Sequence, residues 1–366
     1  MVQKKRVILW GAGNIAKSIL INKYFFQTSI DIICVVDNDK ERWGKYLEGV
    51  EIVSPNYIYN VVYDKIIIAT DVYFDEIREQ LVCELGIDEG KIENRYYFAK
   101  EKILAKYTGS ADLEICKIVD YLQEHRLDVF NSPFVEKYRS MKVDMGYDTA
   151  KKMYYVMHYG KRMYMSRKLN TEEKVLRYYR SICLEQDENS PHLYITKEFD
   201  VAVGDVVVDV GVAEGNFALG IIEKVSKIYL IEADSDWVEA LLCTFESYRD
   251  KVVIFNKFVS DFAFGEMDTL DNLINEKVNF IKMDVEGSEV EVMAGASKII
   301  GEADNLKCVV CTYHRDNDEV AIEKLAAEVG LEGEGTKGYM WYPVGDKQLY
   351  ISPVLRKGVM RYEKKC

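Results

Sequence analysis

The residues best suited to chemistry gather around a glycine turn in the second half of the chain. Gly211 and Gly215 follow the run Val206–Val210, which is apolar apart from Asp209. Such a run is typical of a central parallel strand that is covered on both faces. The glycines allow a sharp turn and a close approach to a ligand, and a helix can start near Asn216. The sequence therefore predicts the nucleotide crevice of an open α/β sheet.

An acid at the end of the next predicted strand points to the nucleoside. The segment Ser226–Glu232 ends in Glu232, 23 residues after Asp209 (232 − 209). A carboxylate in this place can accept hydrogen bonds from both ribose hydroxyls. Two later strand ends bring Ser260 with Asp261, and then Asp284, to the same edge. Four successive predicted strands that each end in an acid or a glycine are a more specific signal of a nucleotide site than one glycine motif alone.

Four segments together resemble the FkbM-type family of S-adenosylmethionine-dependent methyltransferases. They are Asp209–Phe217, Ile231–Ala233, Val259–Asp261 and Ile281–Glu289. The resemblance covers the last half of the chain and implies the doubly wound α/β sheet of a class I methyltransferase, with S-adenosyl-L-methionine as cofactor. One position departs from the family, because Ala213 stands where asparagine is frequent and so offers no polar side chain to the cofactor.

The resemblance also assigns roles to residues. It places Gly211 and Gly215 at the methionine side of the cofactor, Glu232 at the ribose hydroxyls and Asp261 at the adenine edge. Asp209 is expected to orient the glycine turn and to take the cofactor's amino group. The complete set of expected cofactor-binding residues is Asp209, Gly211, Glu214, Gly215, Asn216, Glu232, Ser260, Asp261 and Asp284.

Two residues are the candidates for catalysis. Methyl transfer requires the acceptor atom to be held in line with the methyl group, and a base must take the acceptor's proton. His314 ends the predicted strand next to that of Asp284, and an unperturbed imidazole titrates near neutral pH. His314 is therefore the expected general base; the alternative is a strand-end histidine that only caps the following helix. Asp284 would orient His314, bind the acceptor hydroxyl or ligate a divalent cation.

No metal is predicted, because the segment around Asp284 does not show a complete set of oxygen ligands. Glu286 belongs to the matched motif and is the further acid that could join Asp284 or His314 on a cation. Glu289 also belongs to the matched motif; the alternative is that it is only an exposed acid in the first turn of a helix. His192 precedes the first strand of the sheet, either near the cofactor or as a loop histidine without chemistry.

A second glycine turn lies near the start of the chain. The strand Arg6–Trp10 leads to Gly11 and Gly13, and the next strand ends in Asp37, 24 residues after Gly13 (37 − 13). Three hypotheses compete for this region. It binds a nucleotide or nucleotide-sugar, with the phosphates at the glycines and a ribose at Asp37; it binds NAD(P) as part of a dehydrogenase; or it is an empty scaffold that docks a partner.

These patterns divide the chain into three regions. Residues 1–100 form an α/β domain like the small Rossmann-type domains, 101–189 form a helical and hairpin connection or cap, and 190–366 form the methyltransferase domain. In the middle region, the sequence predicts a hairpin over Met153–Met165 and a helix from Thr171 to about Glu185. Gln348–Ile351 is predicted as a late edge strand, and the basic tail Leu355–Cys366 as loosely held.

Composition limits the class of partner. The 366 residues carry a net charge of −13, so a nucleic-acid backbone is repelled and nucleic-acid methylation is disfavoured. No apolar stretch is long enough to span a bilayer. The eight cysteines form no disulfide framework, which suits a reducing cytoplasm. The expected acceptor is a hydroxyl on a sugar, glycan precursor or other small metabolite. A non-catalytic scaffold that retains the fold is the alternative.

Overall fold

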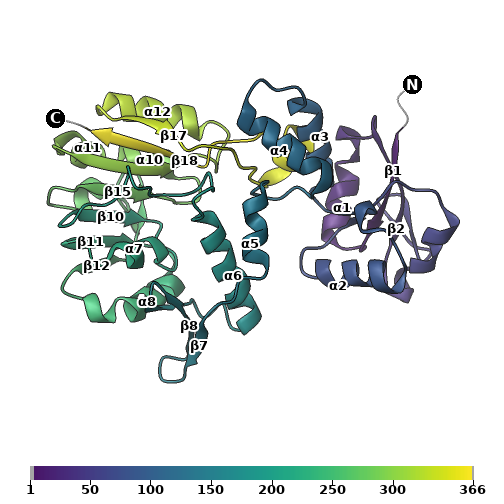
Figure 1. Ribbon diagram of the computed structural model, residues 1–366, viewed down its shortest axis with the longest axis horizontal. Coiled ribbons are helices and arrows are strands. Elements are labelled where there is room, and N and C mark those ends of the chain that lie inside the picture. Colours follow the sequence, from purple (N-terminus) through teal and green to yellow (C-terminus); the bar gives the residue numbers. More distant parts are fainter. Residues whose placement is uncertain (1–3, 365–366) are drawn as a thin grey trace. The chain divides into compact units, whose positions relative to one another are not determined.

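The computed structural model describes residues 4–364, which divide into two compact units (Figure 1). Unit 1 comprises Met1–Ser132 and Trp341–Leu355, and unit 2 comprises Pro133–Met340 and Arg356–Cys366. Each unit contains a sheet of mostly parallel strands with helices between them, so the predicted α/β class is confirmed. Among the described residues, no helix is both long and apolar enough to cross a bilayer.

Unit 1 is built on a six-stranded sheet in the order β3-β4-β2-β1-β5-β6. All neighbours pair in parallel except β3 and β4, which pair antiparallel. The strands are β1 (Lys5–Trp10), β2 (Ile30–Val36), β3 (Tyr46–Leu47), β4 (Val50–Val53), β5 (Lys65–Ile68) and β6 (Ile92–Asn94). The inner strands β1 and β5 end in fully buried runs, as the apolar stretches in the sequence predict.

The helices of unit 1 connect these strands and close its core. The α-helices are α1 (Asn14–Ile21), α2 (Phe74–Glu79), α3 (Tyr97–Tyr107) and α4 (Leu113–Glu124), and a π-helical turn, η4 (Gln80–Glu84), continues α2. The short 3₁₀ turns are η1 (Lys23–Phe25), η2 (Lys40–Arg42), η3 (Pro55–Asn60) and η5 (Glu89–Lys91).

The segment predicted as a late edge strand is helical, so that prediction is wrong. Lys347–Ile351 forms the π-helical turn η8 within unit 1. Its Tyr350 is 4% exposed and packs with Phe26 and Phe98 at ring-centroid distances of 6.4 and 6.5 Å. Tyr350 is therefore buried in the core of unit 1 beside residues more than 250 positions earlier in the chain (350 − 98), which no local pattern reveals.

Unit 2 contains a seven-stranded sheet in the order β12-β11-β10-β15-β16-β18-β17. The first five strands are parallel, and β18 runs antiparallel to both of its neighbours. The strands are β10 (Val206–Val210), β11 (Lys227–Ile231), β12 (Val252–Phe255), β15 (Phe280–Met283), β16 (Leu306–Cys311), β17 (Glu332–Gly335) and β18 (Val359–Lys364). This is the doubly wound sheet that the sequence predicts, with the apolar strand β10 inside it.

Helices alternate with these strands, and Figure 1 shows them beside the sheet. They are α7 (Asn216–Ile221), α8 (Ser235–Thr244), α9 (Leu270–Leu273), α10 (Glu289–Ala294), α11 (Ser297–Glu302) and α12 (Asp318–Glu328), with the 3₁₀ turn η7 (Glu246–Tyr248). Two short strands, β13 (Phe258–Val259) and β14 (Met267–Asp268), pair with each other outside the main sheet.

The segment before the sheet folds as its local signals predict. Strands β7 (Met145–Asp148), β8 (Met153–His158) and β9 (Lys161–Tyr164) form an antiparallel sheet, with the expected hairpin between β8 and β9. The helix α6 (Glu172–Glu185) begins after Thr171, whose side chain accepts a hydrogen bond from Lys174 N. The short η6 (Pro133–Val135) and α5 (Glu136–Arg139) precede them, and β9 packs against α8.

The basic tail contains a strand, so the prediction of a loosely held end is wrong for the residues that the structure describes. β18 lies between β16 and β17, and its Val359 and Tyr362 are 0% and 3% exposed. Lys364 donates to the carbonyl oxygens of Ile300 and Gly301. The prediction followed the basic residues of the tail and overlooked its buried apolar residues, Val359, Met360 and Tyr362. Lys365 and Cys366 lie outside the described residues.

Candidate active site

The glycine turn after β10 is held in a shape that requires glycine. Gly211 has φ +74°, and a Cβ there would lie 1.7 Å from the carbonyl oxygen of Asp284. Gly215 has φ +84° and precedes α7, where a Cβ would meet Leu241 at 2.8 Å. Between them, Ala213 adopts φ +47° although it carries a Cβ. The turn therefore lies directly against the end of β15.

Glu232, at the end of β11, binds this turn through its carboxylate. The backbone N–H of Ala213 donates to Glu232 Oε2 and that of Asp234 donates to Oε1, both at 2.8 Å. A carboxylate has about four acceptor positions, so two remain for other donors. The structure brings Glu232 beside the glycine turn, where the sequence places it.

A buried ion pair joins β10 to β15. Asp209 and Lys282 are register partners, and Lys282 Nζ lies 3.1 Å from Asp209 Oδ1 and donates to the carbonyl oxygen of Gly211 at 2.6 Å. Burial opposes charge on Lys282, but Asp209 and Asp284 raise the lysine pKa. Burial raises the pKa of Asp209 to about 6, against the attraction of Lys282. The sequence analysis missed Lys282, although a lysine within the apolar run Phe280–Met283 is a recognisable signal of a buried partner.

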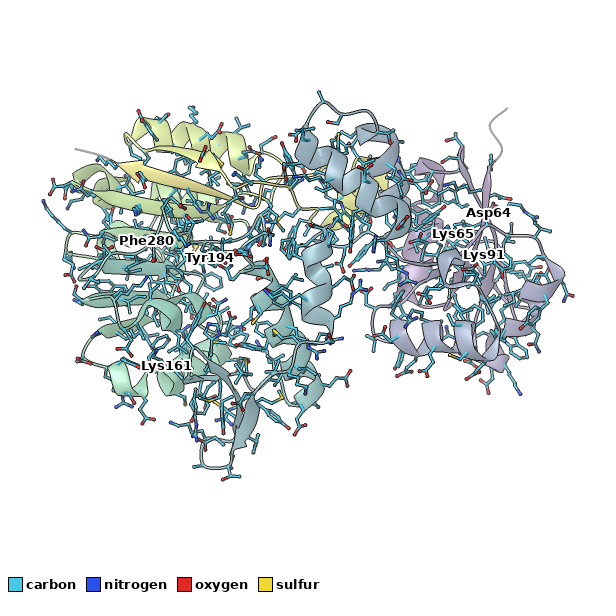
Figure 2. The ribbon with its side chains drawn as sticks, in the orientation of Figure 1. Asp64, Lys65, Lys91, Lys161, Tyr194 and Phe280 are labelled. Carbon is cyan, nitrogen blue, oxygen red and sulfur yellow. The ribbon has the colours of Figure 1, made fainter. Side chains whose placement is uncertain are left out.

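Asp284, which follows β15, is the centre of a second cluster. The Tyr194 hydroxyl donates to its Oδ2 at 2.6 Å, and Figure 2 labels this tyrosine within unit 2. His192 Nε2 lies 3.7 Å from Oδ2, and His314 Nε2 lies 3.7 Å from Oδ1. Burial opposes ionisation, but Lys282 and the two histidines lower the pKa of Asp284 to about 2. Asp284 is therefore a carboxylate at neutral pH, lying between two imidazoles.

His314 is held from its other side by a fully buried acid. Its Nδ1 lies 2.8 Å from Oε1 of Glu289, which is 0% exposed and also accepts from Val285 N at 2.9 Å. The alternative that Glu289 is only an exposed acid is wrong, because its carboxylate is buried and accepts from the backbone of the loop after Asp284. Burial disfavours the imidazolium, but Glu289 and Asp284 outweigh it and raise the pKa of His314. Glu286, which is 80% exposed, lies 3.5 Å from Nε2.

His192 is a buried neutral partner in this cluster. It is 1% exposed, and its Nε2 lies 3.0 Å from the Tyr313 hydroxyl oxygen. Burial lowers the pKa of His192 to about 4. The segment before the sheet therefore does contribute to the site, through both His192 and Tyr194, but only His192 was considered from the sequence.

Helix α6 reaches the same site through Glu214. The Tyr178 hydroxyl donates to Glu214 Oε2 at 2.5 Å, and burial raises the pKa of this acid, which is 4% exposed. Asn216, the first residue of α7, accepts from the backbone N–H of Phe217 at 2.5 Å through its side-chain oxygen. Glu185, the last residue of α6, was also missed. Burial and the charges of Asp284 and Glu214 raise its pKa to about 8.

Ser260 and Asp261 lie in the loop between β13 and β14. Asp261 is exposed, and its Oδ1 accepts from Ser260 Oγ at 3.1 Å. The loop is fixed by Gly295, where a Cβ would lie 2.1 Å from the carbonyl oxygen of Ser260. The assignment of Asp261 to an adenine edge remains a prediction.

Two groups of side chains have a spacing that could hold a metal ion. They are Asp284 with Glu289 and His314, and His192 with Asp284 and Cys311; in each group the ligand atoms lie within 4.8 Å of one another. In the first, Glu289 Oε1 already accepts from the protein backbone and faces His314 Nδ1. Its geometry fits an acid that orients a histidine.

Unit 1 gathers the residues of the first glycine turn. Gly11, Gly13 and Asp37 line one cavity of about 650 Å³. Asp37 Oδ2 accepts from the backbone N–H of Ala12 at 2.8 Å. The three residues chosen from sequence therefore lie together.

Two family models match the chain, one in each unit. Residues 3–93 match the family model C2185-like, N-terminal, and residues 221–330 match the methyltransferase FkbM domain. No curated protein matches the chain in sequence.

Three solved structures are among those to which the chain is similar. Methyltransferase FkbM from Methylobacillus flagellatus is 16% identical with a TM-score of 0.45, over 99% of this chain and 90% of that one. A putative RNA methyltransferase from Pyrococcus horikoshii is 18% identical with a TM-score of 0.31, over 45% and 76%. Magnesium protoporphyrin IX methyltransferase from Synechocystis, with bound SAM, is 14% identical with a TM-score of 0.30, over 44% and 71%.

The match to the FkbM domain model includes Glu232, Asp284, Glu289 and His314 and begins after the glycine turn. The resemblance that the sequence motifs carry is therefore confirmed: residues 221–330 of this chain match the methyltransferase FkbM domain.

Proposed function

We propose that unit 2 binds S-adenosyl-L-methionine and transfers its methyl group to a hydroxyl of a sugar, glycan precursor or other small metabolite. The observation that carries this proposal is the buried series Glu289, His314 and Asp284, which lies at strand ends beside the glycine turn. It combines a base, its orienting acid and an ionised carboxylate in one place.

The charge of the crevice suits this cofactor. Glu214, Glu232 and Asp284 surround the turn, and Glu232 keeps acceptor capacity after its two backbone hydrogen bonds. S-adenosylmethionine carries a sulfonium and an ammonium group, and both are attracted by carboxylates. When bound, it supplies an electrophilic methyl group; the chain supplies the acids that hold the cofactor and the groups that handle the acceptor's proton.

His314 is placed to take that proton. Glu289 holds Nδ1, so the lone pair of a neutral imidazole is at Nε2, on the side of Asp284. A hydroxyl is the acceptor that this arrangement suits, because its oxygen must lose a proton as it gains the methyl group. The imidazolium that forms is stabilised by the carboxylates of Glu289 and Asp284.

Charge and cysteine chemistry support a small acceptor in the cytoplasm. The net charge of −13 disfavours a nucleic-acid substrate. The seven cysteines for which the structure gives a state are all free thiols, in keeping with a reducing compartment.

The test has two steps. Isothermal titration of S-adenosylhomocysteine into the protein should give micromolar-range binding. Incubation with methyl-labelled S-adenosylmethionine and a panel of sugars and hydroxylated metabolites should then label an acceptor, and His314→Ala should abolish most labelling while it leaves the titration unchanged. Failure of the wild type to bind S-adenosylhomocysteine would favour the non-catalytic scaffold instead.

A further inference from the structure

Unit 1 contains a cavity that the methyltransferase chemistry does not use. Its volume is about 650 Å³, within the usual range of ligand sites. Three successive strand ends line it: Gly11–Ile15 after β1, Asp37–Asp39 after β2, and Ala69 with Thr70 after β5. Ligands of open α/β sheets bind at the carboxyl ends of the strands, so this cavity is in the expected place for one.

The two glycine turns of the chain have the same pattern of hydrogen bonds to an acid. In unit 1, Asp37 accepts from the backbone N–H groups of Ala12 and Asp39, both at 2.8 Å. In unit 2, Glu232 accepts in the same way from Ala213 and Asp234, also at 2.8 Å. The residue two positions after each acid also caps the next helical turn: Asp39 accepts from Glu41 N, and Asp234 accepts from Asp236 N.

This correspondence gives Asp37 a functional interpretation. Each acid uses one position on each oxygen to fix its turn, and each retains acceptor capacity toward its crevice. A carboxylate so placed can receive ribose hydroxyls. The hydrogen-bond pattern of Asp37 alone therefore favours a nucleoside as the ligand of unit 1, as that of Glu232 does for unit 2.

Charge distinguishes the two sites. The unit 2 turn carries the buried acid Glu214, whereas the unit 1 turn reads Gly11-Ala-Gly-Asn14 and carries none. Unit 1 has a cation in addition: Arg42 Nη1 donates to the carbonyl oxygen of Ala12 at 2.8 Å and lies 3.5 Å from Asp37 Oδ2. Arg42 remains 45% exposed and lines the cavity. The cavity is also lined by the acids Asp37, Asp39, Glu76 and Glu84, and Arg42 pairs with the first two of them. The Gly11–Asn14 turn itself carries no acid, so it suits an anion better than the turn of unit 2 does.

The backbone and one buried side chain provide further donors. Helix α1 begins after Gly13 without a side-chain cap, so the N–H groups of its first turn face the glycine turn. Trp10 lines the cavity, is 1% exposed, and its indole N–H has no hydrogen-bond partner among residues 4–364. A buried indole N–H normally has a partner, so this one indicates an acceptor atom that a ligand would supply.

We propose that unit 1 binds a nucleoside diphosphate, with the diphosphate at the Gly11–Asn14 turn and Arg42, and the ribose at Asp37. Glu76, Gln80 and Glu84 also line the cavity and supply carboxylates and an amide. Such side chains suit a hydroxyl-rich group attached to the diphosphate. The same recognition would serve a free nucleotide, a nucleotide-sugar or a dinucleotide.

The experiment is titration of the full chain with ADP, UDP and NAD, and with adenosine and uridine as the matching nucleosides without phosphate. At least one of the three diphosphates should bind, and its matching nucleoside should bind about tenfold more weakly or worse, because it cannot use the turn or Arg42. UDP alone indicates a nucleotide-sugar source, and NAD alone indicates a dinucleotide. Absence of binding by all three at millimolar concentration would refute the proposal, as would a nucleoside binding as tightly as its matching diphosphate.

A single methyl group makes the test specific. Gly13 has φ −90°, and a Cβ there meets no atom within 4 Å, so Gly13→Ala fits the folded protein without strain. The added methyl would occupy the space of the phosphate and weaken nucleotide binding by about tenfold or more. The matched control is Gly301→Ala in α11 of unit 2, where a Cβ also meets open space.

Gly301→Ala should bind nucleotide as the wild type does. Unchanged nucleotide affinity in Gly13→Ala, with an unchanged melting temperature, would overturn the proposal. Titration of Gly13→Ala with S-adenosylhomocysteine reports on unit 2 alone, so failure of one site can be told from failure of the other.

Discussion

Glu232 combines two tasks in one carboxylate. It fixes the turn through Ala213 and Asp234, and it has capacity left for a ligand. If it binds the ribose, Glu232→Ala should weaken S-adenosylhomocysteine binding by about 1–3 kcal/mol, since charge-assisted hydrogen bonds are lost. Isothermal titration measures this directly.

The matched variant is Glu232→Gln, which keeps one carbonyl acceptor and should lose less affinity than the alanine variant. Equal affinity of the alanine variant and the wild type would show that Glu232 only shapes the turn.

The pair formed by Glu289 and His314 predicts a pH dependence. His314 must be neutral to accept a proton, and its pKa is raised by Glu289 and Asp284, so the rate should rise with pH through a value above that of free histidine. Glu289→Gln removes the largest attraction for the imidazolium. The rising limb of kcat/KM should therefore move to lower pH, which a pH-rate profile with labelled S-adenosylmethionine measures.

The control for that profile is His314→Ala. This variant should reduce turnover by about 10²–10⁴-fold and should no longer show the rise of kcat/KM with pH. Glu289 acts through His314, so Glu289→Gln should change the position of the limb. If Glu289→Gln lowers the rate equally at every pH, its role is only to support the loop after Asp284.

At the scale of elements, α6 links the connecting region to the site. It begins at the Thr171 cap, it carries Tyr178, which binds Glu214, and Gln186 at its end donates to the carbonyl oxygen of His192. Thr171→Ala should lower the free energy of unfolding by about 1 kcal/mol, because the N–H of Lys174 loses its acceptor. Urea unfolding measures the change.

Thr171→Ser retains the hydroxyl and should stay close to the wild type in the same measurement. A loss in the serine variant as large as that in the alanine variant would assign the effect to the methyl group of Thr171.

Local and non-local elements differ in how well the sequence predicts them. The β8–β9 hairpin and α6 were predicted because a turn pair or a capping residue marks each one within a few positions. β18 and η8 were not, because their environment comes from residues far away in the chain. β18 pairs with β16, where Leu306 lies opposite Lys364, and Tyr350 of η8 packs on Phe26 and Phe98.

At the scale of the whole molecule, charge predicts the class of acceptor. With a net charge of −13, the protein should not bind RNA or DNA. Filter binding with a labelled transfer RNA and a DNA duplex at low salt should show no retention. A complex that weakens steeply as salt increases would contradict this prediction and would make a nucleic-acid acceptor the better hypothesis.

The amino-acid sequence by itself determined the two glycine turns, the acids at the strand ends and the likeness of the C-terminal half to the methyltransferase FkbM domain. These signals lie within short runs, where apolar strands, glycines and acids follow one another in chain order. Only the tertiary structure showed that Glu289 is buried behind His314, that Lys282 neutralises Asp209, and that Tyr194 and His192 reach Asp284.

Only the tertiary structure, likewise, assigned Trp341–Leu355 to unit 1. The reason is physical. A charged or hydrogen-bonding side chain is tolerated in a core only beside a partner. The partner of Lys282 is Asp209, 73 positions away (282 − 209), and the partner of Tyr194 is Asp284, 90 positions away (284 − 194). The type of a buried residue determines whether it requires an ion-pair or hydrogen-bond partner, and the fold determines which distant residue is that partner.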